Sequence, residues 1–250
     1  MKVPLTIIDH LERAEVVYGP RTIVVDEPDQ PAAPWPALTA TRLAETARAQ
    51  AAALDRLGIG VGERVAVVSQ NSARLLAAFW GVSASGRVLV PVNFRLNSAE
   101  VEYIVEHSGA SMVLIDPELD ESLAKVTAEH RYVIGAESDD VLYAFDTEPV
   151  PWEPDEDATA TINYTSGTTA RPKGVQLTHR NLWVNATTFA LHARVIDQNG
   201  DGLVPTPQNV KYVVEGCPPS RRHDANALRQ RRKGFFAHGV EESFCGQPGL

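Results

Sequence analysis

The sequence is poor in the features that mark secreted and membrane proteins. Only two of its 250 residues are cysteines, Cys217 and Cys245, so no disulfide framework is indicated and a reducing compartment fits. No apolar run approaches the ~20 residues that a membrane helix needs, which argues against an integral membrane segment. The opening residues, MKVPLTIIDHLERAE, lack the apolar core of a signal peptide. We therefore expect a cytoplasmic protein.

Positive charge is also in short supply. Lys and Arg together number 23 against 32 Asp and Glu, which gives a formal net charge of −9. This balance argues against nucleic acid as a partner, because a polyphosphate backbone attracts basic surfaces. It suits a protein whose ligand meets a locally positive site. Hydrophobic residues make up 44% of the chain, enough to bury the core of one large domain or of one and a half.

Strand and helix signals alternate over the first half of the chain. Val-rich apolar runs predict buried strands at 63–69, 87–93 and 110–116. Amphipathic or apolar segments with helix-capping residues predict helices at 39–58, 71–86 and 97–109. Thr39 can cap the first helix, and Asn97 and Glu100 stand in capping-box positions at the start of the last. The alternation predicts a doubly wound α/β fold with a mainly parallel sheet.

The pattern is less regular after residue 117. The segment 132–138 predicts one further strand, and 148–158 reads as a Pro-rich acidic loop. TINYT, at 161–165, predicts a strand that runs into a glycine-rich loop. VQLT, at 175–178, is short and extended, and its Thr178 can cap a helix that starts near His179.

Composition changes near residue 196. Alanine becomes scarce, Pro and Gly scatter without a period, and no helix or strand alternation is convincing. We therefore predict one domain over 1–195 and an atypical tail over 196–250, disordered or the product of a frame shift.

The glycine-rich loop YTSGTTARPKG, at 164–174, combines hydroxyls, glycines and a lysine directly after a predicted strand. Gly167 permits close backbone approach, and backbone N–H groups in such a turn form an anion-binding concavity. Lys173 adds a compact positive charge. These properties favour a phosphate cradle over a merely solvated Ser/Thr/Gly turn. It is not a Walker A loop, because the lysine precedes a glycine and no Ser or Thr follows it.

The ordered run from Thr165 to Gly174, TSGTTARPKG, followed by LTHRNL at 177–182, resembles the signature of the AMP-forming adenylating enzymes. These include acyl-CoA synthetases, luciferases and the adenylation domains of peptide synthetases. Ala170 stands where that signature usually has glycine. The resemblance covers about 5–195, includes a P-x-N-x-R element at 91–95, and is closest to bacterial medium- or short-chain fatty acid–CoA ligases.

The resemblance implies that residues 1–195 are part of the large N-terminal domain of an adenylating enzyme. It also implies two reaction steps. A carboxylic acid attacks the α-phosphate of ATP to give an acyl-adenylate and pyrophosphate, and coenzyme A then displaces AMP. By the same resemblance, Lys173 and Thr165 are catalytic and Thr165 contacts Mg²⁺. The residues that surround the β- and γ-phosphates are then Thr165, Ser166, Gly167, Thr168, Thr169, Lys173 and Gly174.

Several later motifs of that family are missing from these 250 residues. Tyr-Gly-x-Thr-Glu, Thr/Ser-Gly-Asp, an Asp-Arg hinge and a lysine-bearing C-terminal domain do not occur. We therefore expect a truncated or frame-shifted acid–thiol ligase with little or no turnover by itself. The alternative is a non-catalytic fragment that binds phosphate or nucleotide, or an inactive pseudogene product.

Smaller signals carry less. GVSASG, at 81–86, departs from the G-x-S-x-G nucleophile elbow and falls in a predicted helix. The run RQRRK at 229–233 reads as a solvated charge run. His179 is equally consistent with contact to phosphate and with packing or capping. Phe79 and Trp80 belong to the predicted core. Four residues that could in principle bind zinc have no compact zinc-site spacing, and we attribute their occurrence to chance: Cys217, His223, His238 and Cys245.

Overall fold

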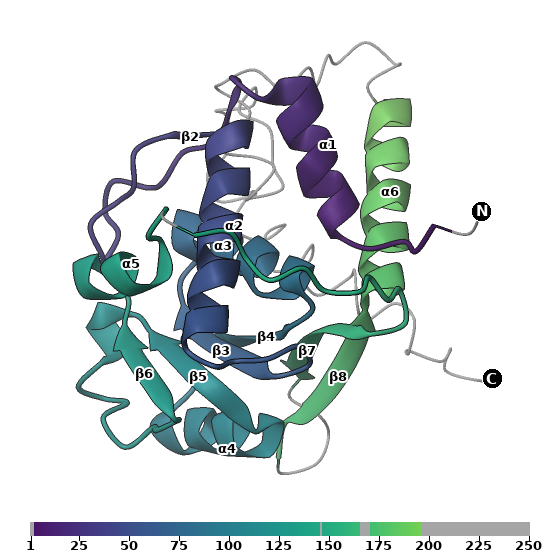
Figure 1. Ribbon diagram of the computed structural model, residues 1–250. Helices are drawn as coiled ribbons and strands as arrows, with labels where there is room; N and C mark the ends of the chain where they lie inside the picture. Colours follow the sequence, from purple (N-terminus) through teal and green to yellow (C-terminus); the bar gives the residue numbers. More distant parts are fainter. Residues whose placement is uncertain (1–2, 146, 166–170, 197–250) are drawn as a thin grey trace, which may run out of the picture. The chain divides into compact units, whose positions relative to one another are not determined.

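The computed structural model describes residues 3–145, 147–165 and 171–196 (Figure 1). All of them lie in the first of the two units into which the chain divides, Met1–Lys211. Their central feature is a six-stranded sheet in the order β6-β5-β3-β4-β7-β8. Its strands are β3 (Arg64–Ser69), β4 (Val88–Asn93), β5 (Ala110–Ile115), β6 (His130–Val133), β7 (Thr159–Thr165) and β8 (Lys173–Thr178).

The first five strands in that order run parallel, and β8 is antiparallel to β7. The predicted mainly parallel sheet is thus confirmed. A separate antiparallel pair joins β1 (Thr22–Val24) to β2 (Leu38–Thr39). The helices are α1 (Ile8–Tyr18), α2 (Ala40–Arg56), α3 (Ala73–Gly81), α4 (Ser98–Ser108), α5 (Ala136–Leu142) and α6 (His179–Ile196), with single 3₁₀ turns at Ser83–Ser85 and Pro117–Leu119.

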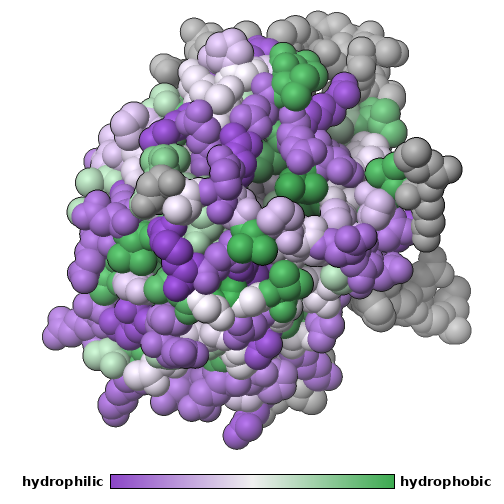
Figure 2. Space-filling model, in the orientation of Figure 1, coloured by the Kyte–Doolittle hydropathy of each residue, from purple (hydrophilic) through white to green (hydrophobic). Residues whose placement is uncertain are grey.

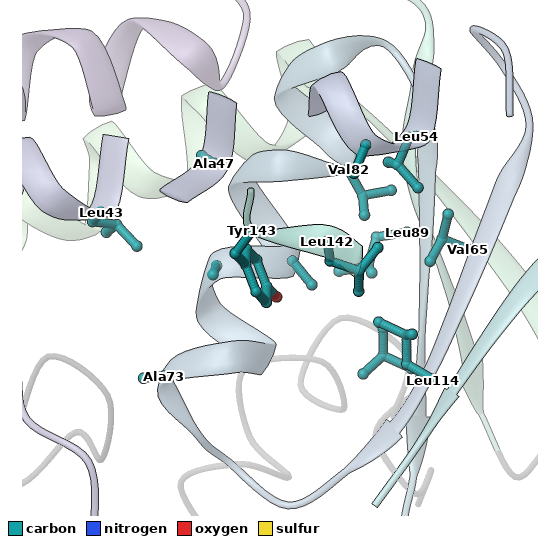
Figure 3. Packing of buried hydrophobic residues seen from close by; sticks show 14 of the residues in the cluster. Leu43, Ala47, Leu54, Val65, Ala73, Val82, Leu89, Leu114, Leu142 and Tyr143 are labelled. Carbon is teal, nitrogen blue, oxygen red and sulfur yellow. The ribbon is translucent and has the colours of Figure 1, made fainter. Parts of the chain in front are cut away.

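Helices cover both faces of the sheet, as β3 shows. Val65 and Val67 pack with residues of α2 and α3, whereas Ala66 and Val68 pack with α4 on the other face. Successive strand residues point to opposite faces, so a strand buried on both sides is apolar throughout. Figure 1 shows α4 across the sheet from α2 and α3. Figure 3 shows from close by the hydrophobic cluster on the face of the sheet that α2 and α3 cover, with Leu54, Val65, Leu89 and Leu114 among its members.

The helix starts follow from capping chemistry. Thr39 accepts a hydrogen bond from the Arg42 amide at 3.1 Å. Asn97 and Glu100 form the reciprocal capping box that their spacing predicts, with both hydrogen bonds at 3.0 Å. Such caps satisfy amides that have no partner within the helix. They fix where α2 and α4 begin.

Two predicted elements differ in extent. The segment 132–138 is not one strand, because β6 ends at Val133 and α5 begins at Ala136. Gly135 has a φ of +154°, a conformation that ends the strand and that L-residues rarely adopt. The helix predicted over 71–86 divides into α3 and a 3₁₀ turn.

The GVSASG segment is structural, as its sequence indicated. The Ser83 hydroxyl is buried and donates to the Ala160 carbonyl at 2.8 Å. The Ser85 hydroxyl is also buried and donates to the Gly81 carbonyl at 2.7 Å. Both side chains tie the end of α3 to its surroundings, and neither is presented as a nucleophile.

The surface is polar where it can be seen. Figure 2 shows one face covered largely by hydrophilic residues, with hydrophobic side chains scattered between them. Scattered apolar side chains are normal for folded proteins. Among the helices of the described ranges, none has the length and apolar character to cross a bilayer.

Candidate functional site

The glycine-rich segment joins two neighbouring antiparallel strands. β7 ends at Thr165 and β8 begins at Lys173, and these two residues are paired across the strands. Because β7 runs parallel to β4, Thr165 lies at the carboxyl end of the parallel strands. Ligands of open α/β sheets bind outside that edge. The segment therefore stands where a nucleotide site is expected.

Thr165 and Lys173 share one face of this hairpin. Directly opposed residues of an antiparallel pair have Cβ atoms roughly 5 Å apart. Both side chains are exposed, and within the described part of the chain no carboxylate forms an ion pair with Lys173. A hydroxyl donor and an ammonium group are thus held side by side and open to an anion.

Gly174 lies on the opposite face of the hairpin, across from Tyr164. A Cβ on Gly174 would lie 3.0 Å from Ile162 Cγ2 and 3.1 Å from Tyr164 Cζ. Both distances are tighter than ordinary van der Waals contact. Glycine fits here because Ile162 and the Tyr164 ring leave little room for a Cβ, and not because its backbone has a positive φ.

Ser166, Gly167, Thr168 and Thr169 lie outside the described residues. Their contacts to phosphate stay predictions, as do the phosphate and Mg²⁺ contacts of Thr165. The exposed Thr165 hydroxyl is a suitable oxygen donor, because Mg²⁺ in phosphate sites takes few protein ligands and keeps water and phosphate oxygens for the rest. No group of three or more metal-ligating side chains occurs in the ranges that the structure describes.

The residues after β8 serve the start of α6. The Thr178 amide donates to Asn181 Oδ1 at 3.1 Å, and the Asn181 amide donates to Thr178 Oγ1 at 3.2 Å. This reciprocal pair explains the Thr-His-x-Asn spacing as a helix cap. It confirms Thr178 as the capping residue.

His179 packs in the interior. Its side chain is fully buried, and its ring lies 5.3 Å from the Trp152 ring. Neither ring nitrogen has a hydrogen-bond partner among the described residues. Burial lowers the pKa of His179, opposed by the charge of Asp155. Of the two roles open from the sequence, packing is the one observed.

Two polar side chains near this edge were not among the predicted site residues. Asn93 ends β4, the neighbour of β7, and its Oδ1 accepts a hydrogen bond from the Arg95 amide at 3.0 Å. Arg171 lies inside the glycine-rich segment, over the ring of Tyr103. A signal for Arg171 was present, because it is a second positive charge two positions before Lys173.

A family model described as AMP-binding enzyme matches residues 12–208. The chain belongs to this family. The match confirms the resemblance carried by the glycine-rich segment, and it begins within α1. The predicted boundary at 195/196 stays a prediction.

Individual AMP-binding enzymes agree with this assignment. The chain is 32% identical to a 4-hydroxybutyrate–CoA ligase of Metallosphaera sedula over 75% of its length, and 33% identical to an acetate–CoA ligase of Humulus lupulus over 80%. The crystal structure of a long-chain-fatty-acid–CoA ligase from Archaeoglobus fulgidus matches 76% of the chain with a TM-score of 0.65 and 29% identity. The alignments span 36%, 39% and 40% of these three proteins. The fold is therefore that of the N-terminal domain of adenylating enzymes.

Proposed function

We propose that the glycine-rich segment binds the β- and γ-phosphates of ATP in the activation of a carboxylic acid. The observation that carries this proposal is the pairing of Thr165 with Lys173 at the carboxyl end of the sheet. The reaction joins the acid to AMP, releases pyrophosphate, and passes the acyl group to coenzyme A. Membership of the family supports the first step, and the CoA ligases among the relatives support the second.

The residues of the hairpin have separate tasks in the first step. Negative charge grows on the departing pyrophosphate as the carboxylate oxygen bonds to the α-phosphorus. Lys173 lies opposite Thr165 and stabilises that charge by a charge-assisted hydrogen bond. The Thr165 hydroxyl donates to a phosphate oxygen or holds Mg²⁺, which when bound neutralises phosphate charge. The backbone amides of the segment orient the phosphate chain.

The substrate class is a carboxylic acid of the fatty acid type. Relatives are named for acetate, 4-hydroxybutyrate and medium- or long-chain fatty acids. These acids share the carboxylate and differ in the tail. The proposal for this chain therefore rests on the carboxylate, and coenzyme A is the proposed acceptor.

A second candidate function is phosphate or nucleotide binding without turnover. The observation that favours it is the hairpin itself, because an exposed hydroxyl paired with an exposed ammonium group suits an anion whether or not an acyl-adenylate forms. In that case the hairpin binds the triphosphate and no acyl-adenylate forms.

The test compares two lysines. Lys173→Ala removes the cation of the site, whereas Lys125→Ala removes an exposed lysine between β5 and β6. We expect Lys173→Ala to raise the Kd for Mg·ATP about tenfold or more, since a charged hydrogen bond is lost, and Lys125→Ala to leave it unchanged. Calorimetry measures binding, and a pyrophosphate assay with a panel of fatty acids measures turnover. Pyrophosphate release that is lost in Lys173→Ala supports the ligase. Binding of Mg·ATP without pyrophosphate release supports the second candidate. Absence of Mg·ATP binding rejects both.

A further inference from the structure

Side chains of α4 contact β7, the first of the two strands that form the stems of the β7–β8 hairpin. Tyr103 and His107 are one helical turn apart, with ring centroids separated by 5.2 Å. His107 Nδ1 lies 2.8 Å from the hydroxyl oxygen of Tyr164, and the two rings meet edge to face at 5.8 Å. Tyr164 directly precedes Thr165. The helix therefore holds the outgoing strand one residue before the candidate phosphate site.

The same helix contacts the residues that lead into the returning strand, β8. The guanidinium carbon of Arg171 lies 5.3 Å from the centroid of the Tyr103 ring, within the range of a cation–π interaction. Arg171 is two residues before Lys173. Both ends of the glycine-rich segment thus meet neighbouring side chains on one face of α4.

Tyr164 links the two stems to each other. Its ring lies across Gly174, the residue that follows Lys173. Burial, with a contribution from Tyr103, raises the pKa of the Tyr164 phenol above its usual value. Ile162, two positions earlier on the same strand face, packs with Tyr164 against the cluster that contains α4.

We propose that four side chains form a clasp that holds both stems of the hairpin against α4 and thereby positions Thr165 and Lys173 for phosphate: Tyr103, His107, Tyr164 and Arg171. These are positioning residues, since alternation along the strands places Tyr164 and Gly174 on the face opposite Thr165 and Lys173. The inference rests on the proposed function, because the positions of Thr165 and Lys173 matter only if the segment binds an anion.

The first variant is Tyr164→Phe, which keeps the ring over Gly174 and removes the hydrogen bond to His107. Tyr132→Phe is the control, because it removes a hydroxyl from β6 at the opposite edge of the same sheet. Hydrogen exchange of the β7 and β8 amides measures how firmly the stems are held. Calorimetry with inorganic pyrophosphate and with Mg·ATP measures the consequence for binding. We expect Tyr164→Phe to speed stem exchange and to raise both Kd values about two- to tenfold, the effect of one hydrogen bond, with Tyr132→Phe changing neither.

A second pair of variants tests whether Arg171 acts through the guanidinium over the Tyr103 ring or through its positive charge alone. Arg171→Lys keeps the positive charge beside the segment and loses the stacked guanidinium, so we expect stem exchange to rise. Arg42→Lys is the matched control. Arg42 belongs to α2, away from the hairpin, and its guanidinium carbon lies 3.8 Å from the centroid of the Phe145 ring. His107→Ala combined with Tyr164→Phe gives a double-mutant cycle. The two effects are expected to be far from additive, because both variants break the same hydrogen bond.

Each outcome decides one point. Unchanged stem exchange in Tyr164→Phe and Arg171→Lys overturns the clasp. Faster exchange with unchanged Kd values shows that the contacts only stabilise the sheet, and overturns the positioning role. If the unmodified chain binds neither pyrophosphate nor Mg·ATP, the proposed function fails and the positioning role falls with it, while the exchange rates still decide whether the clasp holds the stems. Circular dichroism of every variant verifies that the fold is retained.

Discussion

Gly174 illustrates how a single residue is fixed by its neighbour's shape. Its backbone is compatible with other residues, but Ile162 Cγ2 and the Tyr164 ring would crowd a Cβ at 3.0 and 3.1 Å. The lysine–glycine pair at the end of the signature therefore has two physical causes. Lys173 supplies charge on one face of the hairpin, and Gly174 leaves room for a ring on the other.

Gly174→Ala is expected to lower the free energy of unfolding by about 1–2 kcal/mol, the usual cost of overpacking. Urea denaturation measures the change. In a Tyr164→Ala background the cost should be smaller, because the ring that opposes the new methyl group is gone. An equal cost in both backgrounds would show that the ring is not the obstacle.

His179 is a second case at this scale, since its buried ring lacks partners for both nitrogens in the described part of the chain. Burial keeps its pKa in the folded state below the usual histidine value of about 6.5, so the unfolded state binds the proton more readily. The stability that comes from the neutral ring is complete above about pH 6.5 and is lost as the pH falls below it.

We expect His179→Phe to flatten the decline of unfolding free energy between pH 7 and pH 5. Phenylalanine retains a ring beside Trp152 and cannot take up a proton. His130→Phe, at a half-exposed histidine on β6, provides the comparison. Urea denaturation across the pH range measures the slope, and identical slopes for the unmodified chain and His179→Phe would contradict the assignment of this histidine as a buried neutral group.

Among the elements, α4 joins the interior to the candidate site. Val101, Ile104 and Val105 face the sheet in the core, while Tyr103 and His107 meet the hairpin. Its capping box fixes the first turn. A loosened α4 should therefore affect both stability and the hairpin.

Asn97→Ala removes the cap of α4 and should destabilise the protein by about 1 kcal/mol. Asn97→Asp, which keeps a side-chain oxygen for the Glu100 amide, should restore most of the loss. Urea denaturation gives the free energies. If Asn97→Asp were as unstable as Asn97→Ala, the hydrogen bond to the amide would not be the source of the effect.

Elements with strong local signals were predictable from the sequence. Thr39 and Asn97 mark helix starts, and the Val-rich runs of β3, β4 and β5 mark buried strands, because capping and burial act over a few residues. β8 was predicted too short, as 175–178. Its first residues, Lys173 and Gly174, are weak strand formers and owe their extended state to pairing with β7.

At the scale of the whole molecule, the doubly wound arrangement followed from the alternation of strands and helices. The pairing of Thr165 with Lys173 did not, because the spacing alone fits an open loop as well as a hairpin. The contacts of Tyr103 and His107 with the hairpin were also beyond sequence reasoning. They join residues far apart in the chain, and only the order β4-β7 in the sheet brings them together.

The pairing of β7 with β8 sets the distance between the two ends of the glycine-rich segment. Thr165 and Lys173 are kept in register by strand pairing that extends back to Thr159 and Thr178. We therefore expect exchange of residues 166–170 for the corresponding stretch of another AMP-binding enzyme, with Arg171 retained, to leave the Thr165 hydroxyl and the Lys173 ammonium group in place. Under the proposed function, such exchanges would vary the other phosphate contacts around a constant pair formed by the Thr165 hydroxyl and the Lys173 ammonium group.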